Sequence, residues 1–121
     1  MKTQLRTIIS AIPALSKVAT GDLSLRLAYK LKKNMNELQK EADFFSEQRM
    51  KIFEKFGTAD DNGNYSFVTE NETKAITEMD ALLDMEVTPD VEVIDIPITE
   101  KLCISVNDIT LLMPFIHFIE E

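Results

Sequence analysis

The longest regular pattern of apolar residues lies in the segment 24–56, which contains no proline and no glycine. Its apolar side chains recur at alternating spacings of three and four residues, the repeat of an amphipathic helix that packs against another helix. One core position of this repeat is occupied by Arg49. The pattern predicts one long helix over 24–56, and this helix needs a packing partner. The apolar seam comprises Ala28, Leu31, Met35, Leu38, Ala42, Phe45, Ile52 and Phe56.

A second apolar stripe predicts a helix over 69–84, in which Thr69 and Glu72 can form an N-terminal capping box. The linker 58–68 contains an Asn-Gly pair, which is typical of a tight turn between two extended segments. The apolar stripe of the second helix can lie against the seam of the long helix, so the two helices are expected to pack antiparallel. The stripe of the second helix comprises Ile76, Met79, Leu82 and Leu83.

Residues 1–20 predict a short N-terminal helix that contains Pro13. Two alternatives follow from the proline: a turn with a fresh helical start around Ile12, or one kinked helix. Gly21 is expected to close this helix with a positive φ. The candidates for the cap of the long helix are Ser24 and Asp22.

Beyond the second helix the apolar period changes from helical to alternating. Residues 87–104 predict an extended or β region, which two prolines confine to a sheet edge or irregular chain, with Leu102–Ile104 as a second short strand. Residues 105–119 predict a C-terminal helix capped near Ser105 and divided or kinked at Pro114. This segment is too apolar to stay in water, so it docks on the protein's own core or, as the alternative, on a partner or second copy.

Composition supports a single domain over 1–121, since 45% of the residues are hydrophobic and 28% are charged. The predicted fold class is α+β and mostly α: a long antiparallel helical hairpin with a short extended or β region and a C-terminal helix. No apolar run approaches the roughly 18–20 residues of a membrane-spanning helix. The single cysteine, Cys103, excludes an intramolecular disulfide, and the first residues lack a signal-peptide pattern, so we expect a cytoplasmic protein.

The net charge of -8 is divided unevenly along the chain. Residues 1–56 carry eleven Lys or Arg and six Asp or Glu, for a net charge of +5, whereas residues 57–121 carry two and fifteen, for -13. We favour the interpretation that the acidic half folds back along the basic half of the long helix. The alternative is that one charged half meets a charged partner.

Three basic residues, Arg26, Lys30 and Lys33, fall on one face of the long helix. Such a face is usually solvated or paired with carboxylates, and this interpretation is favoured. Contact with phosphates is the alternative, but the cluster is short and belongs to an acidic protein, so nucleic acid is disfavoured as a partner.

Arg49 stands in an otherwise apolar seam, so its guanidinium must be paired or reach solvent. An ion pair with Glu78 or Asp80 is the favoured interpretation, and an arginine that anchors a ligand is the alternative.

The sequence indicates no catalytic, cofactor-binding or metal-binding site. The single histidine, His117, and Cys103 both lie in apolar segments, where such residues are usually structural. Metal-ligand spacings, a phosphate-binding glycine loop and a serine-centred triad are absent. We therefore expect a protein that is not an enzyme.

Several short segments distributed over nearly the whole chain form a recognisable set: Ile12-Pro13-Ala14-Leu15, Leu27-Ala28-Tyr29-Lys30-Leu31, Phe53-Glu54-Lys55-Phe56-Gly57, Asp61-Asn62-Gly63-Asn64-Tyr65, Leu82-Leu83-Asp84-Met85-Glu86-Val87 and Leu112-Met113-Pro114-Phe115-Ile116. In these segments the chain resembles small uncharacterised acidic proteins of tailed bacteriophages and prophages of Gram-positive bacteria. The resemblance implies a phage origin and no particular activity.

The expected function is that of a non-catalytic phage protein that binds host or phage proteins, as a virion, assembly or regulatory component, and can self-associate. Its expected location is the host cytoplasm, with association with the virion as the alternative. A second hypothesis is a DNA-mimicking inhibitor of a host defence nuclease, using the acidic half with Glu78, Asp80 and Asp84. A third is a small-ligand or enzymatic function centred on Arg49.

Overall fold

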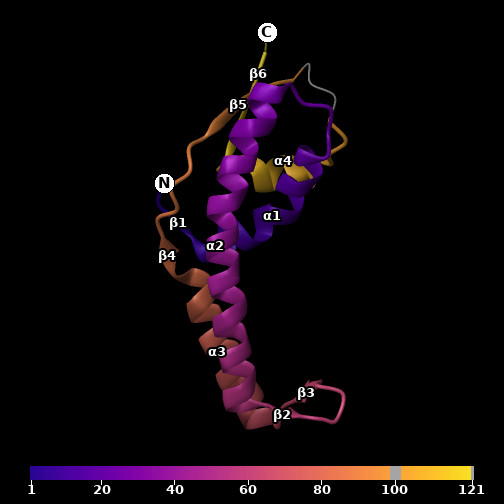
Figure 1. Ribbon diagram of the computed structural model, residues 1–121. Coiled ribbons are helices and arrows are strands. Elements are labelled where there is room, and N and C mark those ends of the chain that lie inside the picture. The colour runs from indigo at the N-terminus through magenta and orange to yellow at the C-terminus, as the bar shows by residue number, and fades with distance from the viewer. Residues whose placement is uncertain (99–101, 121) are drawn as a thin grey trace.

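The computed structural model of the chain describes residues 1–98 and 102–120. The fold is α+β and mostly α, as predicted, and it has two parts (Figure 1). The part that we call the head contains α1 (Leu5–Ala19), the first half of α2 (Leu25–Phe56) and the C-terminal elements. The part that we call the stalk contains the second half of α2, from residue 42, and the antiparallel α3 (Thr69–Asp84).

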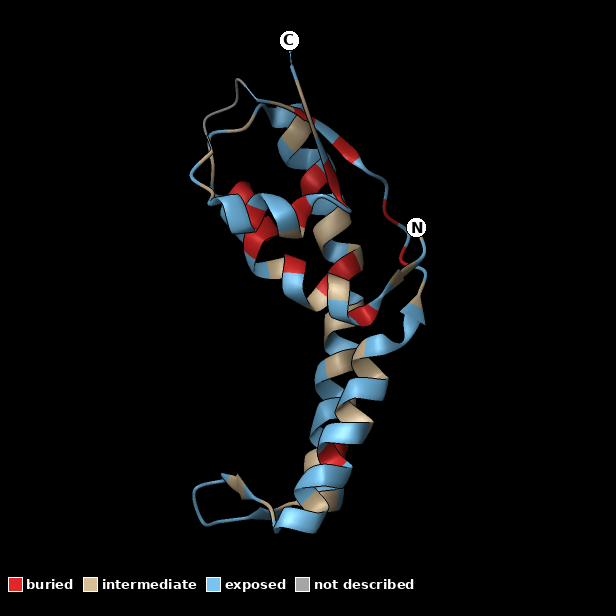
Figure 2. Ribbon diagram, turned by 180° about the vertical axis from the view of Figure 1, so that it is seen from behind, coloured by how far each residue is buried: buried red, intermediate tan, exposed pale blue. Residues whose placement is uncertain are grey.

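Helix α1 forms the centre of the head. Its apolar residues recur every three or four positions and turn one face toward α2 and another toward the C-terminal elements. The buried side chains gather in the head and are sparse in the stalk (Figure 2). The core of the head therefore depends on α1, whose buried residues are Leu5, Ile8, Ala11, Ala14, Leu15 and Val18.

Pro13 lies within α1, which runs without interruption from Leu5. A fresh helical start around Ile12, one of the two alternatives, is therefore wrong. The proline side chain is exposed, so water can replace the hydrogen bond that its missing N–H would have made. The expected positive φ at Gly21 is also wrong, because Gly63 is the glycine with a positive φ. The N–H of Gly21 donates instead to the carbonyl of Val18.

Helix α2 confirms the predicted long helix. The hydroxyl of Ser24 accepts a hydrogen bond from the N–H of Leu27 at 3.4 Å, so Ser24 supplies the cap. Gly57 follows the last helical residue, and with φ of −104° it is not in the left-handed region. A glycine is needed there for space, because a Cβ would lie 2.8 Å from the carbonyl oxygen of Phe53 and 2.9 Å from Cε1 of Phe67.

The predicted turn at 58–68 is a β-hairpin of β2 (Thr58–Ala59) and β3 (Tyr65–Ser66). One carboxylate oxygen of Asp60 accepts hydrogen bonds from the N–H groups of Asn62 and Asn64, at 2.8 and 2.9 Å. Gly63 adopts φ of +81°, which explains the glycine at this position. The hairpin lies at the end of the stalk that is farthest from the head (Figure 1).

Helix α3 spans the predicted range, but its predicted capping box is wrong. The N-cap residue is Val68, with no side-chain hydrogen bond to the helix end. Thr69 already has helical geometry, so its hydroxyl cannot take the cap position. The predicted apolar stripe is also partly wrong, because Ile76 is 55% exposed and Ala75 is buried in its place.

A short antiparallel sheet, which the sequence did not predict, joins the start of the chain to the end of α3. In it β1 (Thr3–Gln4) pairs with β4 (Glu86–Val87). The ion pairs Lys2–Glu86, at 3.2 Å, and Arg6–Asp84, at 2.9 Å, flank this sheet. The N-terminal residues thereby fix the junction between stalk and head.

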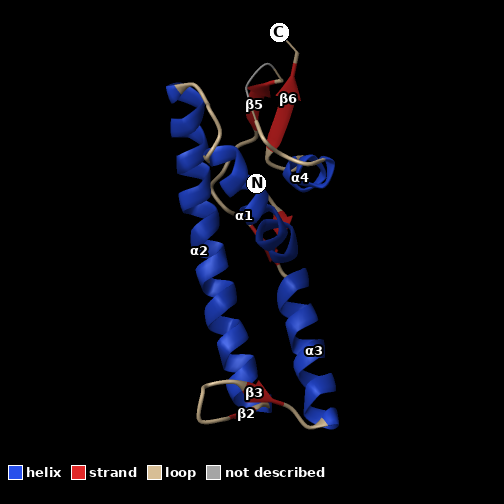
Figure 3. Ribbon diagram, turned by 90° about the vertical axis from the view of Figure 1, so that its right-hand side faces the viewer, coloured by secondary structure: helices blue, strands red, loops and turns tan. Residues whose placement is uncertain are grey.

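The C-terminal segment does not form the helix that was predicted over 105–119. Helix α4 covers Val106–Leu112, and Ile116–Ile119 forms strand β6, which pairs in parallel with β5 (Ile94–Pro97) (Figure 3). Pro114 ends the helix, and the β-branched and aromatic residues that follow it suit a strand. The strand expected at Leu102–Ile104 is wrong, since those residues form no sheet.

Asp108 fixes α4 to α1. Its N–H donates to the hydroxyl of Ser105 and its carboxylate accepts from the N–H of Ser105, which together form the cap predicted for this helix. The carboxylate, 6% exposed, also pairs with Lys17 of α1 at 3.1 Å. The backbone hydrogen bond from Ser105 and the Lys17 ammonium hold the pKa of Asp108 below its usual range.

We predict that Asp108→Asn lowers the free energy of unfolding at neutral pH. Because the pKa is lower in the folded state, the carboxylate stabilises the fold above its unfolded pKa of about 3.9, and this stabilisation disappears as the pH falls through the folded pKa. Urea unfolding at several pH values should show the two proteins converging on acidification below about pH 4. The control Asp61→Asn, at an exposed carboxylate with no ion pair among the described residues, should match wild type throughout; an Asp108→Asn deficit independent of pH would contradict the prediction.

We also predict that Gly57→Ala destabilises the protein by about 1–3 kcal/mol, because the added Cβ meets a backbone oxygen that cannot turn away. Thermal and urea unfolding measure this change. The control is Gly63→Asn in the same hairpin, where a Cβ meets no atom within 4 Å and asparagine tolerates the positive φ. Equal stability of the Gly57→Ala protein and wild type would show that the close contacts at this position do not disfavour a Cβ.

Candidate functional site

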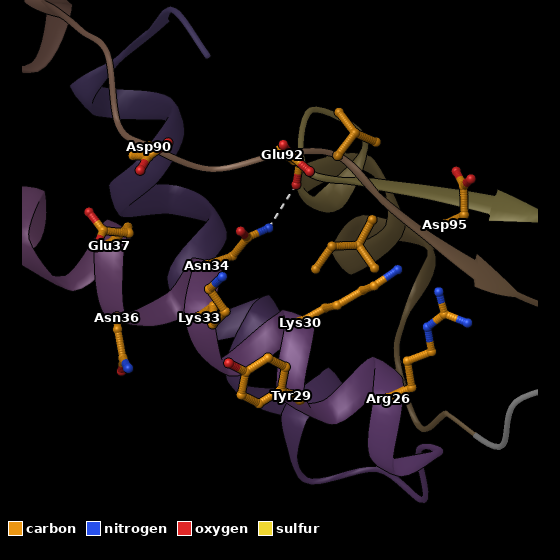
Figure 4. A pocket seen from close by; sticks show the side chains of 12 residues that line it. Arg26, Tyr29, Lys30, Lys33, Asn34, Asn36, Glu37, Asp90, Glu92 and Asp95 are labelled. Atoms are coloured by element: carbon orange, nitrogen blue, oxygen red, sulfur yellow. Dashed lines mark hydrogen bonds between the residues drawn. The ribbon is translucent and has the colours of Figure 1, made fainter.

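A polar groove of about 660 Å³ runs between the first half of α2 and the segment 90–95 (Figure 4). Its α2 wall carries Arg26, Tyr29, Lys30 and Lys33, together with Glu37, which is paired with Lys40. Its opposite wall carries three carboxylates, those of Asp90, Glu92 and Asp95. The volume lies in the range of small-ligand sites, but the lining is far more polar than is usual for them.

The predicted basic residues Arg26, Lys30 and Lys33 thus share one wall of the groove, facing an acidic segment. Within the described residues none of the three forms an ion pair. The direct contact across the groove is a hydrogen bond of 2.7 Å from the side-chain amide of Asn34 to the carbonyl oxygen of Glu92. The acidic wall therefore compensates the basic wall at longer range, which agrees with the favoured interpretation of the divided charge.

The position of the basic wall in α2 raises its positive potential further. The first turn of α2 contains no acidic residue, although a helix N-terminus is stabilised by negative charge. Arg26 lies in that turn and Lys30 follows one turn later. The segment 90–95 supplies the negative charge that the N-terminus of α2 lacks. The groove therefore has a structural role, the electrostatic attraction between its two walls, that requires no ligand.

The ion pair predicted for Arg49 is wrong. Its guanidinium is exposed and lies 4.7 Å from the ring centroid of Phe53, in a cation–π contact. Neither predicted partner reaches it: Glu78 pairs with Lys55 at 2.9 Å, and Asp80 is exposed. On α2, Arg49 precedes the buried Ile52 by three positions and Lys55 follows it by three, so the two cations lie on opposite sides of Ile52, and Glu78 pairs with Lys55.

The acidic residues of the DNA-mimic hypothesis differ in whether they form ion pairs. Glu78 pairs with Lys55 and Asp84 with Arg6, so two of the three carboxylates are balanced by cations at 2.9 Å. Mimicry of a phosphate backbone requires unpaired charges in a regular row. The described structure therefore gives this hypothesis little support.

The stalk leaves an apolar surface that the sequence pattern did not reveal. In α2 from residue 42 and in α3, Ile52 and Ala75 are the buried residues among those described. Phe53 and Ile76 each follow a buried residue by one position. In an antiparallel pair of right-handed helices, the two residues that follow the facing positions lie on the same side, so Phe53, Arg49 and Ile76 share one side of the stalk. Tyr65 and Phe67 of the hairpin segment contact Phe53 there, with ring centroids 5.7 Å away.

The remaining reactive side chains do not form a site in the described residues. His117 lies 3.1 Å from the carboxylate of Asp95, and Cys103 is exposed. Across residues 1–98 and 102–120 there is no group of three or more side chains that could hold a metal ion. In the same ranges, none of the helices has the length and apolar character to cross a membrane.

Comparison of the chain with protein-family models, with curated proteins and with solved structures gives no match.

We predict that Lys30→Glu lowers stability by up to about 1 kcal/mol at low salt, because it places an acidic side chain opposite the three carboxylates of the segment 90–95. The loss should shrink in about 1 M NaCl, where the Debye length is about 3 Å. Lys32→Glu is the matched control, since Lys32 is exposed on the same helix and does not line the groove. An equal effect of both substitutions would argue against an electrostatic role of the groove.

Proposed function

We propose that this chain is a non-catalytic protein of the phage type that it resembles, and that it acts by binding another protein through the stalk. The observation that carries the proposal is the small amount of apolar surface that the stalk buries against itself. Two helices that hold Ile52 and Ala75 between them leave large apolar side chains in contact with water.

The energetics of such a stalk favour a partner. Burial of apolar surface stabilises by about 25 cal/mol per Å², and most helical stability in proteins comes from packing of an apolar face. On the side of the stalk that carries Arg49, Ile76 is 55% exposed, whereas Met50 and Phe44, 48% and 38% exposed, lie on other faces of α2. A partner that covers such side chains gains binding energy that the isolated chain does not use.

The side that carries Ile76 and Arg49, next to the Phe53 ring that Tyr65 and Phe67 flank, suits a helix of the partner. An amphipathic helix can lay its apolar face along two neighbouring helices, with anchors three and four residues apart. Arg49 stands among the apolar side chains without a carboxylate among the described residues. A carboxylate on the partner helix would pair with it and fix the register.

The proposal is tested by affinity purification of the tagged protein from cells of a phage-infected host. We expect one protein to copurify with wild type and to be lost with Ile76→Glu, which places a charge in the apolar surface. Thr77→Glu, at the next and exposed position of α3, should retain it. Circular dichroism should show that both variants are folded.

Equal recovery of the same partner with wild type and Ile76→Glu would contradict binding through this side of the stalk. Once a partner is known, Arg49→Met should weaken its binding by about tenfold or more, as measured by isothermal titration, if Arg49 forms a charged hydrogen bond with it.

A further inference from the structure

The sheet of β5 and β6 is incomplete for its type. Within the described residues it contains two parallel strands of four residues each. Parallel sheets are normally larger and buried, and two isolated strands have little stability of their own. One face of this sheet packs on the core through Ile94, Ile96 and Ile116.

The backbone of β6 shows which groups remain unused. The N–H groups of Ile94 and Ile98 donate to the carbonyls of Phe115 and Ile119, at 3.0 and 2.8 Å. Since backbone groups alternate in direction along a strand, those of Ile116 and Phe118 point away from β5. Among the helices and strands described, β5 is the one that β6 contacts extensively, and no other element lies beside β6 on its outer side (Figure 3).

The outer edge of β6 lacks the devices that prevent strand pairing. Natural edge strands are protected by lysine, proline, bulges or inward charges. The sequence of β6, Ile-His-Phe-Ile, contains none of these. By contrast, β5 ends with Pro97 and carries Asp95, so the other edge of the same sheet is protected.

We propose that the outer edge of β6 pairs antiparallel with β6 of a second copy, so that two chains form one four-stranded sheet. The charges around the strand favour the antiparallel direction. Glu120 follows β6, and parallel pairing would set the two Glu120 carboxylates side by side. Antiparallel pairing separates them and places each beside a strand without acidic residues.

The two-fold symmetry limits the register. Ile116 and Phe118 carry the outward-facing groups, so these residues must face each other across the axis for their hydrogen bonds to form. The axis then passes through His117, so that Ile116 of each chain faces Phe118 of the other. The contact also covers Ile119, which is half-buried in one chain. Because each strand contributes four residues, the interface is at the small end for protein pairs, and the dimer is weak.

The first test is the mass of the purified chain as a function of concentration, measured by sedimentation velocity from about 1 μM to about 1 mM. The expected result for wild type is a shift from 13.8 kDa toward twice that mass. Phe118→Pro, which removes an outward N–H, should stay monomeric, and the matched control Phe118→Val, which keeps it, should dimerise. A wild type that stays monomeric, or equal dimerisation of the two variants, overturns the proposal.

A second measurement does not depend on the folding of the proline variant. In a Cys103→Ser background, His117→Cys places an exposed thiol near the axis, and mild oxidation should join two chains through it. Asn62→Cys, at the far end of the stalk, is the control and should not crosslink at the same concentration. Equal crosslinking of the two variants overturns the proposal. Either failure leaves the binding of a different protein by the stalk unaffected, so the two proposals are tested separately.

Discussion

The burial of α1 is the interaction on which the rest of the structure depends. Its apolar residues occupy more than one face of a helix of 15 residues, so it can be stable only when surrounded. Helix α2 covers one side, α4 covers another, and the Lys17–Asp108 ion pair fixes α4 in place. The sheet of β1 and β4 then holds the first residues of α1 against the end of α3. The long helix α2 has the most regular sequence pattern, but it supplies only one side of the core of the head.

This arrangement concentrates stability at one end of the molecule. The head has a contiguous apolar core, whereas the stalk has a narrow seam between two helices. Local unfolding free energies follow such differences in burial, so the stalk is the part that opens first. A surface that becomes ordered on binding loses conformational entropy, which lowers its affinity for the partner. It can, however, adapt its shape to that partner. The electrostatic groove, in turn, joins α2 to the extended segment without requiring a close ion pair.

Much of the helical framework could be predicted, because caps and apolar periods are local. Ser24, Asn62-Gly63 and Ser105 each define an element boundary through bonds to residues no more than four positions away. Strand β6 could not be predicted in this way, since Ile116–Ile119 is compatible with both periods and its partner is more than 20 residues distant. The basic stripe was predicted as one face, yet the position of Arg49 depended on the rotation of α2 relative to α3, which single-helix periodicity does not determine.

The β1–β4 sheet has a consequence for the order in which the chain folds. Thr3 pairs with Val87, and the α-amino group of Met1 donates to the carbonyl of Pro89 at 3.3 Å. The stalk is closed by residues that are near one another in sequence, whereas the head requires residues 3 to 119 together. During synthesis on the ribosome, the helical hairpin can therefore form first, while the side of α1 that α4 covers stays exposed until α4 leaves the exit tunnel. Chaperones that bind apolar segments would find α1 available throughout that interval.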